Sequence, residues 1–131
     1  LENIATNTLK RKILHNRYFS KLIHLKNKKI LFFNEFNKYY KSNFHAFFIL
    51  VNSKKQKDEL IKYLLKNKIN SYIGYVPLHS SKVGTKLGLN KSYLPKTNIF
   101  AKTVIRLPMH NNMTLKDVDF VCDNINKFYE T

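Results

Sequence analysis

Apolar residues in the first part of the chain recur at the spacing of one helix face. Between positions 3 and 26 they are mostly three or four residues apart, and no glycine or proline interrupts the segment. This spacing predicts a long amphipathic helix with a single apolar stripe. The stripe consists of Leu9, Ile13, Leu14, Tyr18, Leu22 and Leu25. A long helix at the start of a chain often packs on something else, so we expect the stripe to meet another surface.

Three runs of aromatic and β-branched residues predict strands at 30–33, 44–51 and 69–75. The run 44–51 is almost wholly β-favouring, which indicates a buried strand. A helix is expected to begin at Ser53, because Gln56 stands three residues later in a capping-box pattern. It is expected to end at Asn67, as a C-cap in the left-handed conformation. Its apolar face is Leu60, Ile61, Leu64 and Leu65.

The last third of the chain begins with an irregular stretch that ends near Pro95. Proline at a first-turn position predicts a short helix over 95–104. The segment 106–109 is expected to be extended because it contains a proline. Thr114 and Asp117 are placed to cap a final helix. Helices and strands do not alternate strictly, so the expected fold is α+β, a small, mostly antiparallel sheet with helices on one face.

The composition of the 131 residues supports a folded domain with a core. Apolar residues make up 44% of the chain, too many for a disordered polycation. The longest apolar run, 47–51, is too short to cross a membrane, and no signal peptide is visible. Cys122 is the single cysteine, which fits a reducing compartment. The first residue is Leu1, so we interpret the chain as processed, trimmed or part of something longer.

The formal net charge of +16 raises the question of a nucleic-acid partner. Only Arg11, Arg17 and Arg106 among the 24 basic residues are arginines, and the lysines are spread along the whole chain. Arginine is the residue that reads bases and phosphates in a bidentate manner. We therefore interpret the lysines mainly as a solvated surface, one that still favours a polyanion such as a nucleotide diphosphate.

Residues able to carry chemistry are sparse. The five histidines lack metal-site spacing, the eight carboxylates form no evident pair, and the isolated glycines form no phosphate-binding loop. Cys122 lies on the apolar stripe of the last helix, which favours a core role over a reactive one. The exception is the segment 74–81, where a predicted strand ends in Tyr75 and a turn carries His79, Ser80 and Ser81. Strand ends often hold functional groups.

This segment belongs to a series of motifs that resembles the C-terminal part of the DegT/DnrJ/EryC1/StrS aminotransferases. The motifs are, in order, NFHAFFI at 43–49, YVPLH at 75–79, Gly84, RLPM at 106–109 and NMT at 112–114. The resemblance covers about two thirds of the chain and implies the small domain of a fold-type-I enzyme that uses pyridoxal 5'-phosphate (PLP). It implies a connecting helix at 1–28 followed by the small domain at 29–131.

The resemblance places the chemistry outside this chain. The family's Schiff-base lysine, the acid facing the cofactor and the aromatic stacked on it all lie upstream of the similar region. We therefore expect no catalytic, cofactor-binding or metal-binding residue here, and no transamination by the chain alone. Expected partners are the missing large domain and a second copy in a cytoplasmic homodimer, without nucleic acid or membrane.

The version of the motif at 77–84 is most similar to the branch that aminates dTDP-4-keto-6-deoxyglucose with glutamate for cell-envelope polysaccharide or lipopolysaccharide. This implies that Tyr75 and His79 hydrogen-bond the sugar nucleotide, with Ser80 and Ser81 secondary. For His45 a structural role is favoured. Arg106 is able to neutralise a diphosphate, but a place on a surface strand is favoured.

Two other interpretations remain open at this point. The aromatic run at 44–48 loosely resembles the RNA-binding strand of an RNA-recognition motif, although the glycine of that motif is missing, so a basic RNA-binding α+β module is the alternative. A pure assembly module is the other, in which the first helix docks a partner or a second copy.

Overall fold

Four short strands form one antiparallel sheet in the order β1-β2-β4-β3. The computed structural model describes residues 3–35, 42–74, 76–91 and 94–130. In the register, Leu31 lies opposite Val51 and Phe47 lies opposite Leu107. The strands are β1 (Leu31–Phe32), β2 (Phe47–Val51), β3 (Tyr72–Ile73) and β4 (Val104–Leu107). The expected α+β class with a small antiparallel sheet is confirmed.

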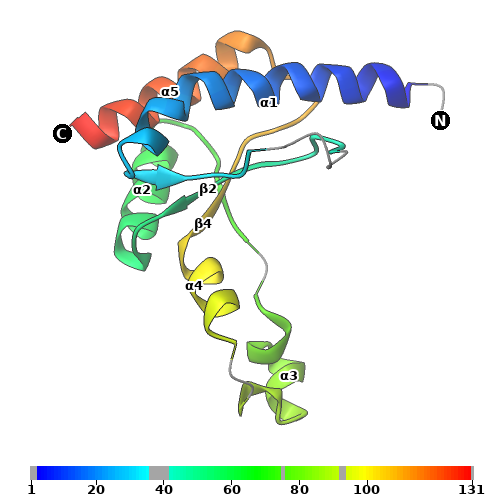
Figure 1. Cartoon of the computed structure of the whole chain (residues 1–131), viewed down its shortest axis with the longest axis vertical. Coiled ribbons are helices and arrows are strands. Elements are labelled where there is room, and N and C mark those ends of the chain that lie inside the picture. The colour runs from blue at the N-terminus through cyan, green and yellow to red at the C-terminus, as the bar shows by residue number, and fades with distance from the viewer. Residues whose placement is uncertain (1–2, 36–41, 75, 92–93, 131) are drawn as a thin grey trace.

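Three helices pack on one face of this sheet, as Figure 1 shows. They are α1 (Ile4–Asn27), α2 (Lys54–Lys66) and α5 (Leu115–Glu130). Helices α1 and α5 run side by side, and an ion pair joins them: the Arg17 guanidinium donates to both carboxylate oxygens of Asp119 at 2.7 and 2.8 Å. Side chains of β2 alternate between buried and half-buried, as expected for a sheet covered on one face.

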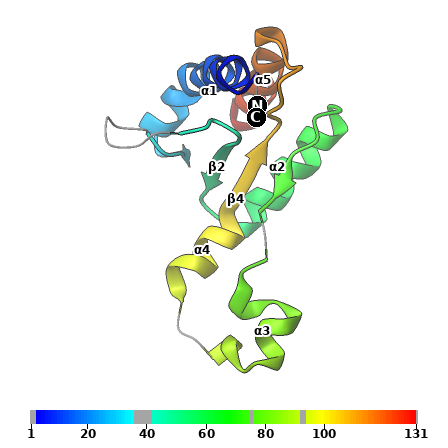
Figure 2. The ribbon, with the colours of Figure 1, turned by 90° about the vertical axis from the view of Figure 1, so that its right-hand side faces the viewer.

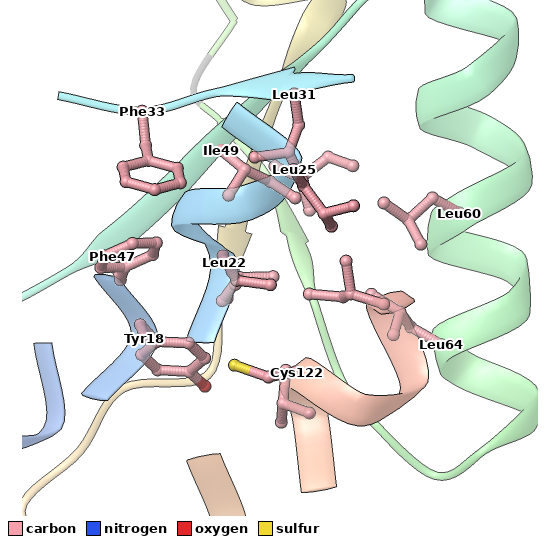
Figure 3. Packing of buried hydrophobic residues seen from close by; sticks show 14 of the residues in the cluster. Tyr18, Leu22, Leu25, Leu31, Phe33, Phe47, Ile49, Leu60, Leu64 and Cys122 are labelled. Atoms are coloured by element: carbon pink, nitrogen blue, oxygen red, sulfur yellow. The ribbon is translucent and has the colours of Figure 1, made fainter. Parts of the chain in front are cut away.

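The core lies between these helices and the sheet, and Figure 3 shows part of it. Tyr18 of α1 is fully buried, stacks on Phe47 with ring centroids 5.0 Å apart, and donates its hydroxyl proton to the Pro108 carbonyl at 2.8 Å. Cys122 is also fully buried. Each buried large apolar side chain contributes roughly 1.5–3 kcal/mol, so this cluster is the main source of stability.

The remaining elements form an arm that projects from the end of the sheet away from α1 (Figures 1 and 2). We call the described residues 76–91 and 94–103 the arm. It contains two short 3₁₀ turns, η1 (Leu78–Ser80) and η2 (Leu89–Lys91), and two helices, α3 (Lys82–Lys86) and α4 (Pro95–Thr103). Among the described residues, none of the helices combines the length and the hydropathy that a membrane span requires.

The structure corrects several expected boundaries. The second strand begins at Phe47 and not at Phe44, because Phe44 has a φ of 51° and breaks the extended chain. The residue in the left-handed region after α2 is Lys68, with a φ of 61°, and not Asn67. The strand expected at 69–75 is only two residues long, and β4 starts at Val104, directly after α4. Leu9 and Ile13, expected in the buried stripe of the first helix, are exposed.

Candidate functional site

The face of the sheet away from the three helices borders an open groove of about 1160 Å³. Residues that alternate with the core positions of β2 and β4 supply its floor: Phe48, Val104 and Arg106. The arm supplies one wall through Pro77, Leu78 and Phe100, and the segment before β2 supplies another. The Phe48 and Phe100 rings meet edge to face at 5.8 Å between centroids. The groove is therefore a largely apolar hollow with two packed aromatic rings in its lining.

Two ionisable side chains line this groove among the described residues, Arg106 and His45. Arg106 lies on β4 between Phe48 and Tyr72 of the neighbouring strands. The His45 ring lies with Nδ1 2.9 Å from the amide oxygen of Asn43, and since that oxygen only accepts, Nδ1 is the donor. An arginine in a partly apolar hollow is well placed to bind a carboxylate or a phosphate.

His79 anchors the turn after β3 to α4. Its ring is buried, with 8% of the residue exposed, and Nε2 donates to the side-chain oxygen of Asn98 on α4 at 2.9 Å. This bond ties the turn to α4, so that Pro77 and Leu78 present one wall of the groove. Binding of a substrate by His79 itself stays a prediction, and Tyr75, the other leading candidate, lies outside the described residues.

The two serines of this turn are engaged in local hydrogen bonds. Ser81 caps α3: its Oγ accepts from the Gly84 N–H at 2.9 Å and donates to the Leu78 carbonyl at 2.8 Å. Ser80 Oγ donates to the Pro77 carbonyl at 3.2 Å. Both bonds stabilise the turn. A part for either serine in substrate binding stays a prediction.

The groove does not by itself fit covalently bound PLP. That cofactor needs a lysine, and no lysine or carboxylate is among the described residues that line the groove. Lys57 is a buried lysine whose pKa is lowered, chiefly by burial, but its Nζ donates to the Ala101 carbonyl and it does not border the groove. Nor do the described residues contain a cluster of three or more histidine, cysteine, aspartate or glutamate side chains suited to a metal.

The sequence favours a surface strand for Arg106 and a structural role for His45. The structure places Arg106 on β4 and brings both residues to the groove, and the role of each stays a prediction. A signal for Arg106 was present in the sequence. It stands between Ile105 and Leu107, which both point into the core, so the period of two puts it on the opposite face. No comparable signal existed for His45, because it precedes the strand.

The chain is similar to known proteins of one family. The model of the DegT/DnrJ/EryC1/StrS aminotransferase family matches residues 1–126. No curated protein matches the chain.

Several solved structures share the fold over nearly the whole chain. DesV of S. venezuelae is 22% identical with a TM-score of 0.88, and the match covers 100% of this chain and 34% of DesV. Spr1654 of Streptococcus pneumoniae, assigned as a sugar aminotransferase and solved in a PLP form, is 22% identical with a TM-score of 0.87 over 99% and 33%. PseC of Helicobacter pylori, an aminotransferase of pseudoaminic acid biosynthesis, is 22% identical with a TM-score of 0.81 over 99% and 34%. The chain thus spans about a third of the length of these enzymes.

Proposed function

The chain belongs to the DegT/DnrJ/EryC1/StrS aminotransferase family, and from this premise we propose that it is the small C-terminal domain of a PLP-dependent enzyme that aminates a sugar nucleotide. The observation that carries the proposal is the groove on the outer face of the sheet, where Arg106 lies among apolar and aromatic side chains. Such a hollow suits one side of a ligand that has both an anionic and a ring-shaped part.

We propose that residues 1–28 connect this domain, 29–131, to a large domain that holds the cofactor. Exposed apolar side chains support this division. At the start of α1, Ile4, Leu9 and Ile13 are each about half exposed, and on the arm Leu78 is 84% exposed. Apolar surface of this extent is uncommon on an isolated soluble domain and marks contact with another surface.

In this proposal the chain binds and orients substrate while the large domain supplies PLP. Bound there, PLP provides the electron sink that lets glutamate's amino group pass to a keto sugar. Arg106 neutralises the diphosphate of the sugar nucleotide. Tyr75 hydrogen-bonds the sugar, and Ser80 and Ser81 are secondary contacts. His79 hydrogen-bonds the sugar nucleotide together with Tyr75, and its bond to Asn98 fixes the turn that carries it.

For the substrate we propose a dTDP-4-keto-6-deoxy sugar, aminated at C4 to give dTDP-4-amino-4,6-dideoxygalactose for a cell-envelope polysaccharide such as lipopolysaccharide. The support is the sequence Pro77-Leu78-His79-Ser80-Ser81 followed by Gly84, which is most similar to that branch of the family. The enzyme is proposed to work in the cytoplasm as a homodimer.

The test is to express this chain joined to the region that its gene encodes directly upstream. The product is incubated with PLP, glutamate and dTDP-4-keto-6-deoxyglucose. Formation of the dTDP-amino sugar, followed by mass spectrometry, is the expected result. An upstream sequence without a cofactor-binding lysine, or a polypeptide that turns over no keto sugar nucleotide, would overturn the proposal.

The role of Arg106 is tested in the same polypeptide with Arg106→Gln. A charge-assisted hydrogen bond to phosphate is worth roughly 1.5–3 kcal/mol. The KM for the sugar nucleotide should therefore rise about tenfold or more while the KM for glutamate stays unchanged. Lys62→Gln, which removes an exposed charge on α2, is the matched control. Equal KM values for the sugar nucleotide in both variants would contradict the assignment.

The RNA-binding alternative is not favoured. The family match covers the aromatic run on which that alternative rests. Phe47 of that run is 2% exposed and packs in the core, so it is not available to stack on a base.

A further inference from the structure

A second hollow, of about 380 Å³, lies on the other side of the turn from the groove, between the start of α2 and the second half of α4. We call it the lysine pocket. Its polar lining consists of Lys54, Lys57, Asp58, Ser80, Asn98 and Lys102. Three lysines and one aspartate thus line the lysine pocket. The proposed function assigns no role to these four charged residues.

Lys57 is the central residue of the lysine pocket. It is 6% exposed, and its one hydrogen bond within the described residues goes from Nζ to the Ala101 carbonyl at 2.9 Å. An ammonium group has three donors, so this bond leaves two of them unused. No carboxylate of the described residues lies within ion-pair distance of Lys54, Lys57 or Lys102.

Burial disfavours the charge on the Lys57 ammonium group. The pKa of Lys57 is lowered, chiefly by burial; the charge of Asp58 opposes this, and the weaker effect of Lys54 adds to it. A buried cation costs free energy to the extent that it is not paired, and Asp58 compensates only in part. An anion between the three lysines would restore the balance.

Two further features of the lysine pocket favour an anion. Asn98 uses its side-chain oxygen to accept from His79, which leaves its NH₂ group as a donor. The lysine pocket also lies at the N-terminal turn of α2, a 13-residue helix whose dipole attracts negative charge. The Asp58 carboxylate acts in the opposite direction, so the net positive charge comes from the lysines.

We propose that the lysine pocket binds a phosphate group, held by the ammonium groups of Lys54, Lys57 and Lys102 with the amide of Asn98. The lysine pocket and the groove share Pro77 and Ala101 in their walls. A phosphate bound there would join α2 to α4. Through the bond between Asn98 and His79 it would also support the turn that forms one wall of the groove. This site goes beyond the proposed function and does not depend on it.

The test is an NMR titration of the ¹⁵N-labelled chain with inorganic phosphate, with sodium chloride at matched ionic strength as the reference. Phosphate should give saturable shifts at the amides of Lys57, Ser80 and Asn98. In Lys54→Gln/Lys102→Gln, which changes two exposed side chains and so preserves the fold, binding should be at least about tenfold weaker. Lys62→Gln/Lys66→Gln, two exposed lysines of α2 outside the lysine pocket, is the matched control and should bind as the original chain does.

A second titration, with dTDP, identifies the source of the phosphate group. If the amides of the lysine pocket shift with inorganic phosphate, the ligand is free phosphate. If they shift with dTDP alone, the ligand is the diphosphate of a nucleotide. Shifts with neither ligand, shifts no larger than those caused by chloride, or equal weakening in both double variants would overturn the proposal. The outcome of either titration is independent of whether the larger polypeptide transaminates.

Discussion

At the scale of single residues, Gly84 is the position where the turn tolerates the least change. A Cβ atom there would lie 2.0 Å from the Leu78 carbonyl oxygen and 3.0 Å from the His79 carbonyl group. Both are backbone atoms, so no side-chain rotation relieves the overlap. The α3 segment packs directly on the turn because residue 84 has no side chain.

We therefore expect Gly84→Ala to displace the turn and loosen the bond between His79 and Asn98. Overpacking of this kind costs roughly 1–3 kcal/mol. Amide hydrogen exchange should show faster exchange in the arm, with the core helices α1 and α5 unchanged. The control is Gly88→Asn, since Gly88 has a φ of 73°, which asparagine tolerates, and open space around it. Equal exchange rates in both variants would contradict this role of Gly84.

Cys122 is the second residue with a direct prediction. It is fully buried on α5, and burial is the main cause that raises the pKa of its thiol to about 12. The thiolate is the reactive form, so the folded chain should react with iodoacetamide at about pH 8 only as fast as it unfolds. Addition of urea should give rapid alkylation. Rapid alkylation of the folded chain would show that Cys122 is not the core residue described here.

At the scale of elements, the ends of the helices follow local sequence signals. The capping pattern at Ser53 is present, with the Gln56 N–H donating to Ser53 Oγ at 3.1 Å. Asp117 accepts from both the backbone N–H and the hydroxyl of Thr114, at 2.7 and 2.8 Å, and so closes the first turn of α5. These hydrogen bonds hold the pKa of Asp117 below its ordinary value.

A pH dependence of stability follows from Asp117. Because its pKa is lowered in the folded state, its contribution is present above its unfolded pKa of about 3.9 and is lost as the pH falls through the lower folded value. The free energy of unfolding, measured with urea, should therefore decrease on acidification below about pH 4. In Asp117→Asn that decrease should be smaller, with Asp123→Asn as an exposed control. The same slope in all three proteins would contradict the prediction.

The sequence predicts the order of the elements but not the groove. Helix caps and the buried run of β2 depend on neighbouring residues, and the cap at Ser53 and the alternating burial of β2 are confirmed. The left-handed residue after α2 was predicted wrongly, and Leu9, Ile13 and Leu65, which were predicted on buried helix faces, are exposed. The strand boundaries were wrong where one residue overrides the pattern, as Phe44 does with its positive φ. The groove joins residues from β2, β4 and the arm, and only the strand pairing brings Phe48 opposite Arg106. Nor does local sequence reveal that the His79 ring points toward α4.

At the scale of the whole molecule, the apolar surface is concentrated at two extremities, the start of α1 and the arm. The most exposed of these side chains are Leu78 at 84% and Leu87 at 70% on the arm, and Leu9 at 58% at the start of α1. The net charge of +16 opposes contact between two copies in solutions of low salt. Apolar attraction and charge repulsion thus act against each other in the isolated chain.

We expect the chain on its own to self-associate, and more strongly as salt screens the charge. Size-exclusion chromatography with light scattering should show a mass that rises with protein and salt concentration. Leu78→Gln/Leu87→Gln and Leu9→Gln/Ile13→Gln identify which extremity is responsible. A strict monomer at high protein and salt concentration would contradict the view that these apolar surfaces contact another protein surface.

The central claim is that this domain shapes a substrate site while the cofactor chemistry belongs to another part of the enzyme. The most direct measurement is the visible absorbance of the purified 131-residue chain after incubation with PLP and gel filtration. We predict that no absorbance of a covalently held cofactor remains and that borohydride traps no stoichiometric adduct on a specific lysine. A stable band, with one lysine labelled in full, would contradict the account.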